Sequence, residues 1–122
     1  MEIGLKHIST LVVTEKELAL NVGSGDLPVL ATPAMLALME NAAMLAVKEA
    51  LPHDSTTVGG MIESSHLKPT KLGNAVKATA TLEKIEGRKL YFKVEAYEGE
   101  TLIGSGKHLR FIVERDKFLS KL

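Results

Sequence analysis

The chain has 122 residues, 45% hydrophobic and 25% charged, which favours a single domain over residues 1–122, near the size at which oligomerisation adds stability. Fifteen basic and fifteen acidic residues cancel, so the charge gives no reason to expect nucleic acid or a membrane as a partner. The absence of cysteine excludes disulfides, thiolate nucleophiles and cysteine-based metal sites.

The first quarter of the chain predicts short extended elements. Residues 1–10 contain no continuous apolar stretch of the kind found in signal peptides, so we expect a cytoplasmic protein. Residues 8–13 are β-branched and apolar, which predicts a short strand. Residues 18–22 alternate apolar and other side chains, as a second strand or an extended arm would. A flexible glycine-containing loop follows over residues 23–26.

Residues 33–51 predict one long helix. The segment is rich in Ala, Leu and Met, and its apolar residues surround most of the helix circumference, which is typical of a buried helix. Thr32 is placed to cap the helix, with Pro33 at its first position, and Pro52 ends it. Glu40 is the only charged residue between positions 33 and 47.

The rest of the chain predicts strands and tight turns. Residues 58–67 are strand-like but open with two glycines, and a loop follows over residues 68–74. Strands are then predicted over residues 75–83, 90–97 and 101–114, with turns at 86–88 and 98–100, a kink or bulge near Gly104 and Gly106, and a short helical turn in 115–122. A curved antiparallel sheet wrapped around the helix is the simplest way to bury it. The sequence therefore predicts an α+β hot-dog domain.

Glu40 is the first candidate for chemistry. A carboxylate inside an apolar helix is costly to bury, and in such a setting it has a raised pKa or dedicated hydrogen-bond partners, both of which catalysis uses. The alternative is a helix with one polar stripe, in which Glu40 and Asn41 simply reach solvent. The pattern alone leaves both interpretations open.

Four further features complete the candidates. They are Thr32 at the helix start, the Gly59–Gly60 pair, His66 in a polar patch, and Arg110 in the last strand. Thr32 alone is better explained as a helix cap, and a lone strand histidine is more often structural than catalytic. The other histidines are less well placed, since His108 neighbours charged residues. No histidine spacing suits zinc, and we expect no metal and no cofactor.

Taken together, these residues resemble the hot-dog thioesterases of the fluoroacetyl-CoA thioesterase type. The resemblance spans about residues 28–120 and rests on Thr32, Glu40 and His66 at matching separations, together with residues 31–35, 38–42, 58–60, 86–88, 103–108 and 117–118. It implies a catalytic group of Thr32, Glu40 and His66. It also implies that Gly59, with Gly60 beside it, lies against the thioester carbonyl, and that Arg110 has a place in the site.

The chemistry of a thioester suits these residue types. Backbone N–H groups at Gly59 and Gly60 can approach the developing oxyanion. Glu40 would attack the carbonyl or act as general base for water, and Thr32 would position or polarise Glu40. His66 would activate water or protonate the leaving thiolate.

The resemblance also bears on assembly and substrate. It implies a homodimer joined edge to edge, able to pair further into a tetramer, with the site at the interface. The CoA phosphates would meet basic residues such as Lys68, Lys71, Arg88 or Lys107. The specialised fluoroacetyl enzymes carry aromatic residues before the helix, where this chain has Leu-Pro-Val-Leu at 27–30. We therefore expect a small or medium acyl-CoA as substrate, not fluoroacetyl-CoA itself.

Two other functions fit the same fold. One is a non-catalytic acyl-CoA binding module that uses the same pocket. The other is a hot-dog dehydratase or hydratase acting on acyl thioesters, although the chain lacks the His-Phe-Pro segment usual in those enzymes.

Overall fold

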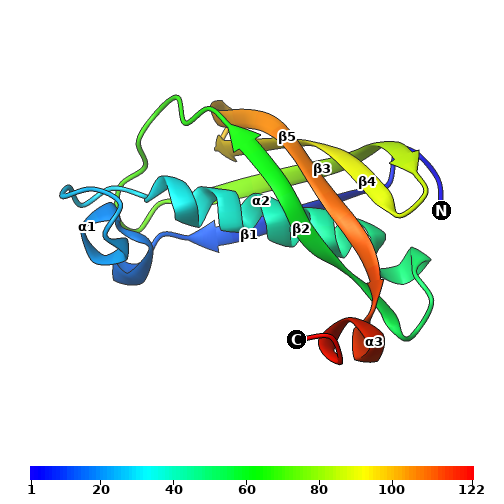
Figure 1. Cartoon of the computed structure of the whole chain (residues 1–122). Coiled ribbons are helices and arrows are strands. Elements are labelled where there is room, and N and C mark those ends of the chain that lie inside the picture. The colour runs from blue at the N-terminus through cyan, green and yellow to red at the C-terminus, as the bar shows by residue number, and fades with distance from the viewer.

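The computed structural model, which describes residues 1–122, has one antiparallel sheet curved around one long helix (Figure 1). The sheet order is β1-β3-β4-β5-β2. Its strands are β1 (Lys6–Val12), β2 (Ser55–Ser64), β3 (Ala75–Glu86), β4 (Lys89–Glu98) and β5 (Thr101–Glu114). The helices are α1 (Ala19–Val22), α2 (Thr32–Val47) and α3 (Arg115–Leu119), with 3-10 turns at Glu15–Glu17 and Lys48–Ala50. The predicted α+β hot-dog architecture is confirmed.

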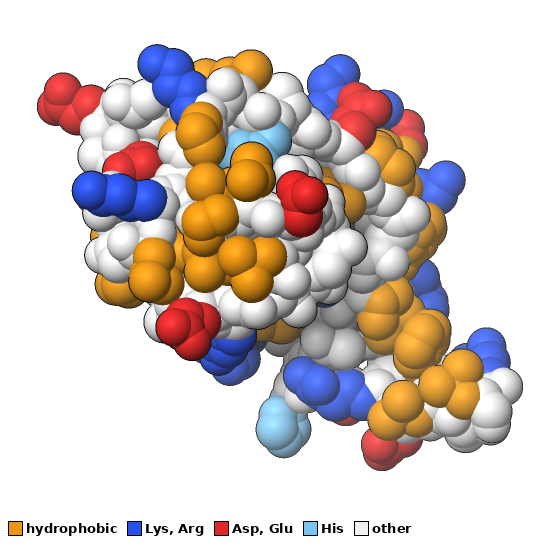
Figure 2. Space-filling view, turned by 90° about the vertical axis from the view of Figure 1, so that its left-hand side faces the viewer, with side chains coloured by type: hydrophobic (Ala, Val, Ile, Leu, Met, Phe, Trp, Pro, Cys, Tyr) orange, Lys and Arg blue, Asp and Glu red, His pale blue; other side chains and the backbone are white.

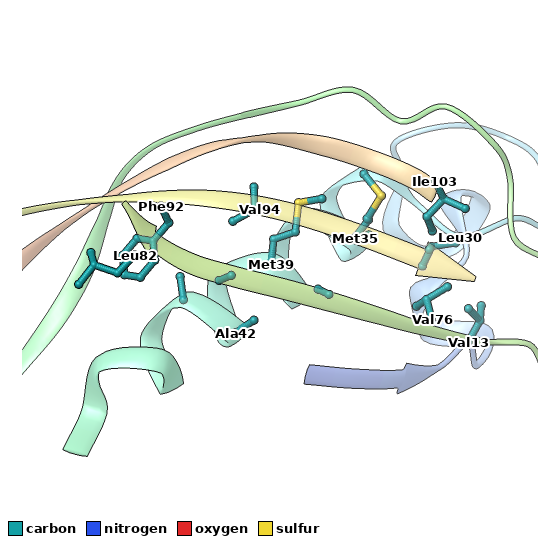
Figure 3. Close-up of a cluster of buried hydrophobic side chains, with 14 of the residues drawn as sticks. Val13, Leu30, Met35, Met39, Ala42, Val76, Leu82, Phe92, Val94 and Ile103 are labelled. Carbon is teal, nitrogen blue, oxygen red and sulfur yellow. The ribbon is translucent and has the colours of Figure 1, made fainter. Parts of the chain in front are cut away.

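The core lies between α2 and the concave face of the sheet (Figure 3). One face of α2 contributes fully buried side chains, among them Met35, Met39 and Ala42. Facing them are the alternate residues of β3 and β4 that the sequence predicts to point inward, namely Val76, Ala78, Ala80, Leu82, Leu90, Phe92, Val94 and Ala96, all at most 2% exposed. The two-residue period of the strands is therefore confirmed as the core pattern.

Two expectations about the helical segments are wrong. Helix α2 is covered on one side only, since Ala37 and Asn41 on its other side are exposed. Residues 19–22 form the short helix α1 instead of a strand or arm. Gly23, with a φ of 90°, ends this helix in the left-handed conformation that glycine adopts readily. No helix in the chain is both long and apolar enough to traverse a bilayer.

Strands β2 and β5 pair with a β-bulge that matters for the site. Gly59 is opposite Arg110 and Met61 is opposite Leu109, so Gly60 is an extra residue on β2. Such a residue has no position in the hydrogen-bond ladder. Farther along the same pair, Gly106 lets the strands approach closely, because a Cβ there would collide with the backbone carbonyl of Glu63.

Candidate active site

Glu40 lies on the side of α2 that faces β2 and forms an ion pair with Arg110. Glu40 Oε2 is 3.7 Å from Arg110 Nη1, and the Glu40 side chain is 42% exposed, whereas that of Arg110 is 8% exposed. The carboxylate is therefore neither fully buried nor simply solvated. Burial lowers the pKa of Arg110 and the charge of Glu40 opposes this shift, but a guanidinium stays protonated in proteins. A fixed positive charge therefore lies beneath the carboxylate.

Arg110 is held in place by Thr57 on the neighbouring strand. Arg110 Nε donates to Thr57 Oγ1 at 2.8 Å, and Nη2 donates to the Thr57 carbonyl at 3.0 Å. Both residues are buried, so these bonds satisfy donors that would otherwise be costly to desolvate. Thr57 was not among the predicted site residues. β-Branched residues are common in strands, so the sequence alone does not indicate that Thr57 belongs to the site.

His108 is a further member of this group. It is 1% exposed, its Nδ1 lies 2.7 Å from the Met61 carbonyl, and its Nε2 lies 3.1 Å from Arg110 Nη1. Burial and the nearby Arg110 charge both lower the pKa of His108. The imidazole is therefore neutral near pH 7, with Nδ1–H donating to the carbonyl and Nε2 accepting from Arg110.

The sequence rated His108 below His66 because of its charged neighbours, but the structure places His108 beside Arg110 and in the lining of the Glu40 cavity. Its charged sequence neighbour Lys107 is exposed on the opposite face of β5, whereas the alternation of the strand puts His108 and Arg110 on the inner face. The alternation of inward and outward residues along the strand is therefore the sequence feature that could have identified His108.

The glycine pair of β2 lies beside Glu40. A cavity of about 320 Å³ is lined by Glu40, Gly59, Gly60, Met61, Ile62 and His108. A Cβ at Gly59 would lie only 2.9 Å from Glu40 Oε2. Any residue other than glycine at position 59 would therefore crowd the carboxylate. A Cβ at Gly60 would instead meet the ring of Phe111, which packs on the other face of the bulge.

Thr32 and His66 form a second pair at the start of α2. Thr32 Oγ1 lies 2.7 Å from His66 Nδ1. The expected capping role of Thr32 is wrong, because Ala31 is the N-cap, Pro33 is the second helical residue, and no side chain caps the helix. Burial lowers the pKa of His66, and its Nε2 is buried without a hydrogen-bond partner. The hydroxyl is thus engaged with a histidine 34 residues away in sequence.

This pair opens into a recess of about 310 Å³ near α1. The recess is lined by both apolar and polar residues: Ala19, Ser24, Val29, Leu30, Thr32, His66, Leu67, Lys68 and Pro69. Figure 2 views this end of the molecule and shows hydrophobic side chains gathered on its surface. The recess therefore has mixed walls, in which the Thr32–His66 pair lies among aliphatic side chains.

The structure does not bring Thr32 to Glu40 within one chain. Eight residues along α2 correspond to about 12 Å of helix rise, and the two side chains bond to His66 and Arg110 respectively. The expected contact between Thr32 and Glu40 is therefore absent, and the predicted residues form two groups: Thr32 with His66, and Glu40 with Gly59, Gly60 and Arg110.

The basic residues proposed to bind the CoA phosphates also lie in different parts of the structure. Lys68 borders the recess beside His66, whereas Arg88 lies with Lys117 and Lys121 near α3. No group of three or more His, Asp or Glu side chains is arranged to hold a metal ion.

Comparison with known proteins places this geometry in a family. Residues 13–116 match the model of the fluoroacetyl-CoA-specific thioesterase family. The fluoroacetyl-CoA thioesterase of Streptantibioticus cattleyicolor is 37% identical over 94 residues, which cover 77% of this chain and 68% of that protein.

Solved structures agree over nearly the whole chain. A threonine-to-serine mutant of the fluoroacetyl-CoA enzyme FlK, in complex with acetyl-CoA, superposes with a TM-score of 0.93 at 30% identity, covering 99% of this chain and 96% of that one. A Thermus thermophilus hypothetical protein, described as a thioesterase superfamily member, gives a TM-score of 0.89 at 30% identity, covering 98% and 88%. The expected class of activity, acyl-CoA thioester hydrolysis, is thereby confirmed, and the chain belongs to the fluoroacetyl-CoA-specific thioesterase family.

Proposed function

We propose that this chain hydrolyses small or medium acyl-CoA thioesters to the free acid and CoA, with Glu40 as the catalytic carboxylate. The observation that carries this proposal is the position of Glu40 against the glycine bulge of β2, with its carboxylate 2.9 Å from where a Gly59 side chain would begin. A thioester carbonyl in the cavity between them would contact the carboxylate and the backbone of the bulge together.

The residues suit acyl transfer. The N–H groups of the Gly59–Gly60 bulge would donate to the oxyanion, since the extra residue Gly60 has no position in the ladder. Glu40 would either attack the carbonyl carbon, forming a mixed anhydride and expelling the CoA thiolate, or remove a proton from the attacking water. In the first route, water then hydrolyses the anhydride and regenerates the carboxylate. His66, whose pKa is lowered by burial, would exchange the proton with water or with the thiolate.

The complete site requires a second copy of the chain. Thr32 and His66 lie about two helical turns from Glu40, too far to act on the same carbonyl within one chain. Strand β2 is an edge strand of ten residues, and such an edge is a ready surface for pairing. We infer a homodimer joined along β2, in which His66 of one subunit meets Glu40 of the other. Further pairing into a tetramer stays a prediction, as does the cytoplasmic location.

The aliphatic recess supports a small or medium acyl group. Its volume of about 310 Å³ exceeds what a two-carbon acyl group needs, and the aliphatic side chains in its lining can contact an alkyl chain. The relative at 37% identity is named for fluoroacetyl-CoA. Here, however, residues 27–30 before α2 carry no aromatic side chain, so selection for fluorine is not expected.

Hydrolysis of a panel of acyl-CoA chain lengths, followed with a thiol reagent, tests the function. We expect turnover by the native chain and a loss of about 100- to 10,000-fold in Glu40→Ala and Glu40→Gln, as for removal of a general base. Glu49→Gln is the matched control, because Glu49 is exposed beyond the end of α2.

Native activity in Glu40→Ala would contradict the proposal. Tight acyl-CoA binding without turnover on any chain length would favour the binding module, and interconversion of enoyl- and 3-hydroxyacyl-CoA would favour the dehydratase or hydratase.

Subunit complementation tests the shared site. Glu40→Ala and His66→Ala should each be inactive alone, and mixing them under conditions of subunit exchange should restore part of the activity, because each mixed dimer then contains one intact Glu40–His66 combination across the interface. No recovery, despite exchange verified by mass spectrometry, would refute a site shared in this way.

A further inference from the structure

We propose that His108 is a positioning residue for Glu40, because its neutral imidazole holds Arg110 on one side and the Gly60 bulge on the other. The inference rests on the proposed function in that Glu40 is taken as the catalytic carboxylate. Nothing in the reaction requires His108 to touch the substrate.

The first step concerns Arg110. Its guanidinium has five N–H donors. Nε and Nη2 bind Thr57, while Nη1 lies between His108 Nε2 at 3.1 Å and Glu40 Oε2 at 3.7 Å. His108 therefore accepts from one of the two N–H groups of Nη1 and holds that nitrogen in place, 3.7 Å from Glu40 Oε2. A short charge-assisted bond from Arg110 would stabilise the carboxylate anion and reduce its reactivity. The longer contact orients Glu40 and leaves it available.

The second step concerns the bulge. His108 Nδ1 binds the carbonyl of Met61, the residue immediately after the extra Gly60. The same ring approaches the other side of the bulge, since its Cε1 is 3.6 Å from a Cβ built on Gly59. One imidazole thus fixes both the backbone expected to bind the oxyanion and the partner of the carboxylate. Its own orientation is supported by Phe92, whose ring centroid is 6.1 Å away.

The third step concerns protonation. Only the neutral imidazole with its proton on Nδ1 can donate to Met61 and accept from Arg110 at once. The charged groups that face it are Arg110 on its own strand and Glu40 on α2, whereas β4 presents the Phe92 ring and β2 the Met61 carbonyl. Protonation would set two cations side by side and remove the acceptor. The arrangement is therefore lost when the pH falls far enough to protonate His108.

Two substitutions with a matched control test the inference. Glutamine offers an acceptor to Arg110 and a donor to Met61 without titrating, whereas phenylalanine offers neither. We expect His108→Phe to lower kcat by about 10- to 100-fold, since a misplacement of about 1 Å can cost about 100-fold, with KM changed less than about threefold. His108→Gln should recover most of the loss. The control is His53→Gln, because His53 lies exposed in a loop.

Equal kcat in His108→Phe and the native chain would overturn the inference, and so would equal losses in the Phe and Gln variants when both keep the native circular dichroism spectrum. If His108→Phe does not fold, nitrogen-15 NMR of the histidine rings in the native protein still decides. We expect the Nδ1–H tautomer for His108, and protonation at a lower pH than that of a histidine in an unfolded chain. An Nε2–H tautomer would refute the role. This measurement needs no turnover, so it tests the role of His108 independently of the proposed hydrolysis.

Discussion

Replacing Gly59 by alanine should abolish most activity without unfolding the protein. The new Cβ would lie 2.9 Å from Glu40 Oε2, whereas ordinary contacts begin at 3.4 Å. The carboxylate must therefore retreat by at least about 0.5 Å, away from the bulge. By the rule that about 1 Å of misplacement can cost about 100-fold, kcat should fall roughly 10- to 100-fold.

Stability should change little, for two reasons. The Glu40 side chain is 42% exposed within its own chain, so its end is not packed tightly and can shift within the cavity, and its long ion pair contributes at most about 1 kcal/mol. Alanine also restricts the unfolded chain, which stabilises the fold by about 0.4–1 kcal/mol. These effects offset each other, and the free energy of unfolding should stay within about 1 kcal/mol of the native value.

Acyl-CoA turnover and urea unfolding, measured on the same preparations, check both parts. Gly106→Ala is the contrasting variant, because its Cβ would collide with the rigid backbone of Glu63, and overpacking of this kind costs about 1–3 kcal/mol. Native kcat in Gly59→Ala would refute the reasoning that Gly59 makes room for a catalytic Glu40. Unfolding of Gly59→Ala would refute the account of its stability.

Two further predictions concern the same region. Thr57→Val removes the hydroxyl that accepts from Arg110 Nε and leaves a buried donor unpaired. The free energy of unfolding in urea should therefore fall by about 1–3 kcal/mol. An unchanged unfolding midpoint would contradict this. The pKa values of His66 and His108 are lowered in the folded state by burial, so below about pH 6.5 the unfolded chain binds more protons than the folded one. The free energy of unfolding should therefore fall as the pH is lowered from 7 to 5, and less steeply in His108→Gln.

The sheet was predictable because its pattern is local. In β3 and β4 every second residue is apolar, and a strand with one buried face requires no more than that. The unusual setting of Glu40 was also predictable, since a single charged residue in an apolar helix can be recognised without knowing its partner.

The errors share a non-local cause. Thr32 reads as a cap from its neighbours alone, but its hydroxyl is bound to His66, which only the folded chain brings near. The charges near His108 in sequence argue against it, but Lys107 points to the opposite face of β5 and Arg110 is a hydrogen-bond partner on the inner face. The one-sided burial of α2 could not be read from its composition, because an apolar residue that faces a sheet and one that is left uncovered have the same sequence signal.

The separation of the two polar groups has a consequence for how such an enzyme changes over evolution. The recess near α1 is lined mainly by residues of two loops, one before α2 and one after β2, and loops tolerate substitution and changes in length. The Glu40 group is built from the middle of α2 and two paired strands, where His108, Arg110 and Thr57 constrain one another. If the recess binds the acyl group as proposed, its loop residues can vary while Thr32, His66 and the Glu40 group stay fixed, so that new substrates are acquired without rebuilding the chemistry.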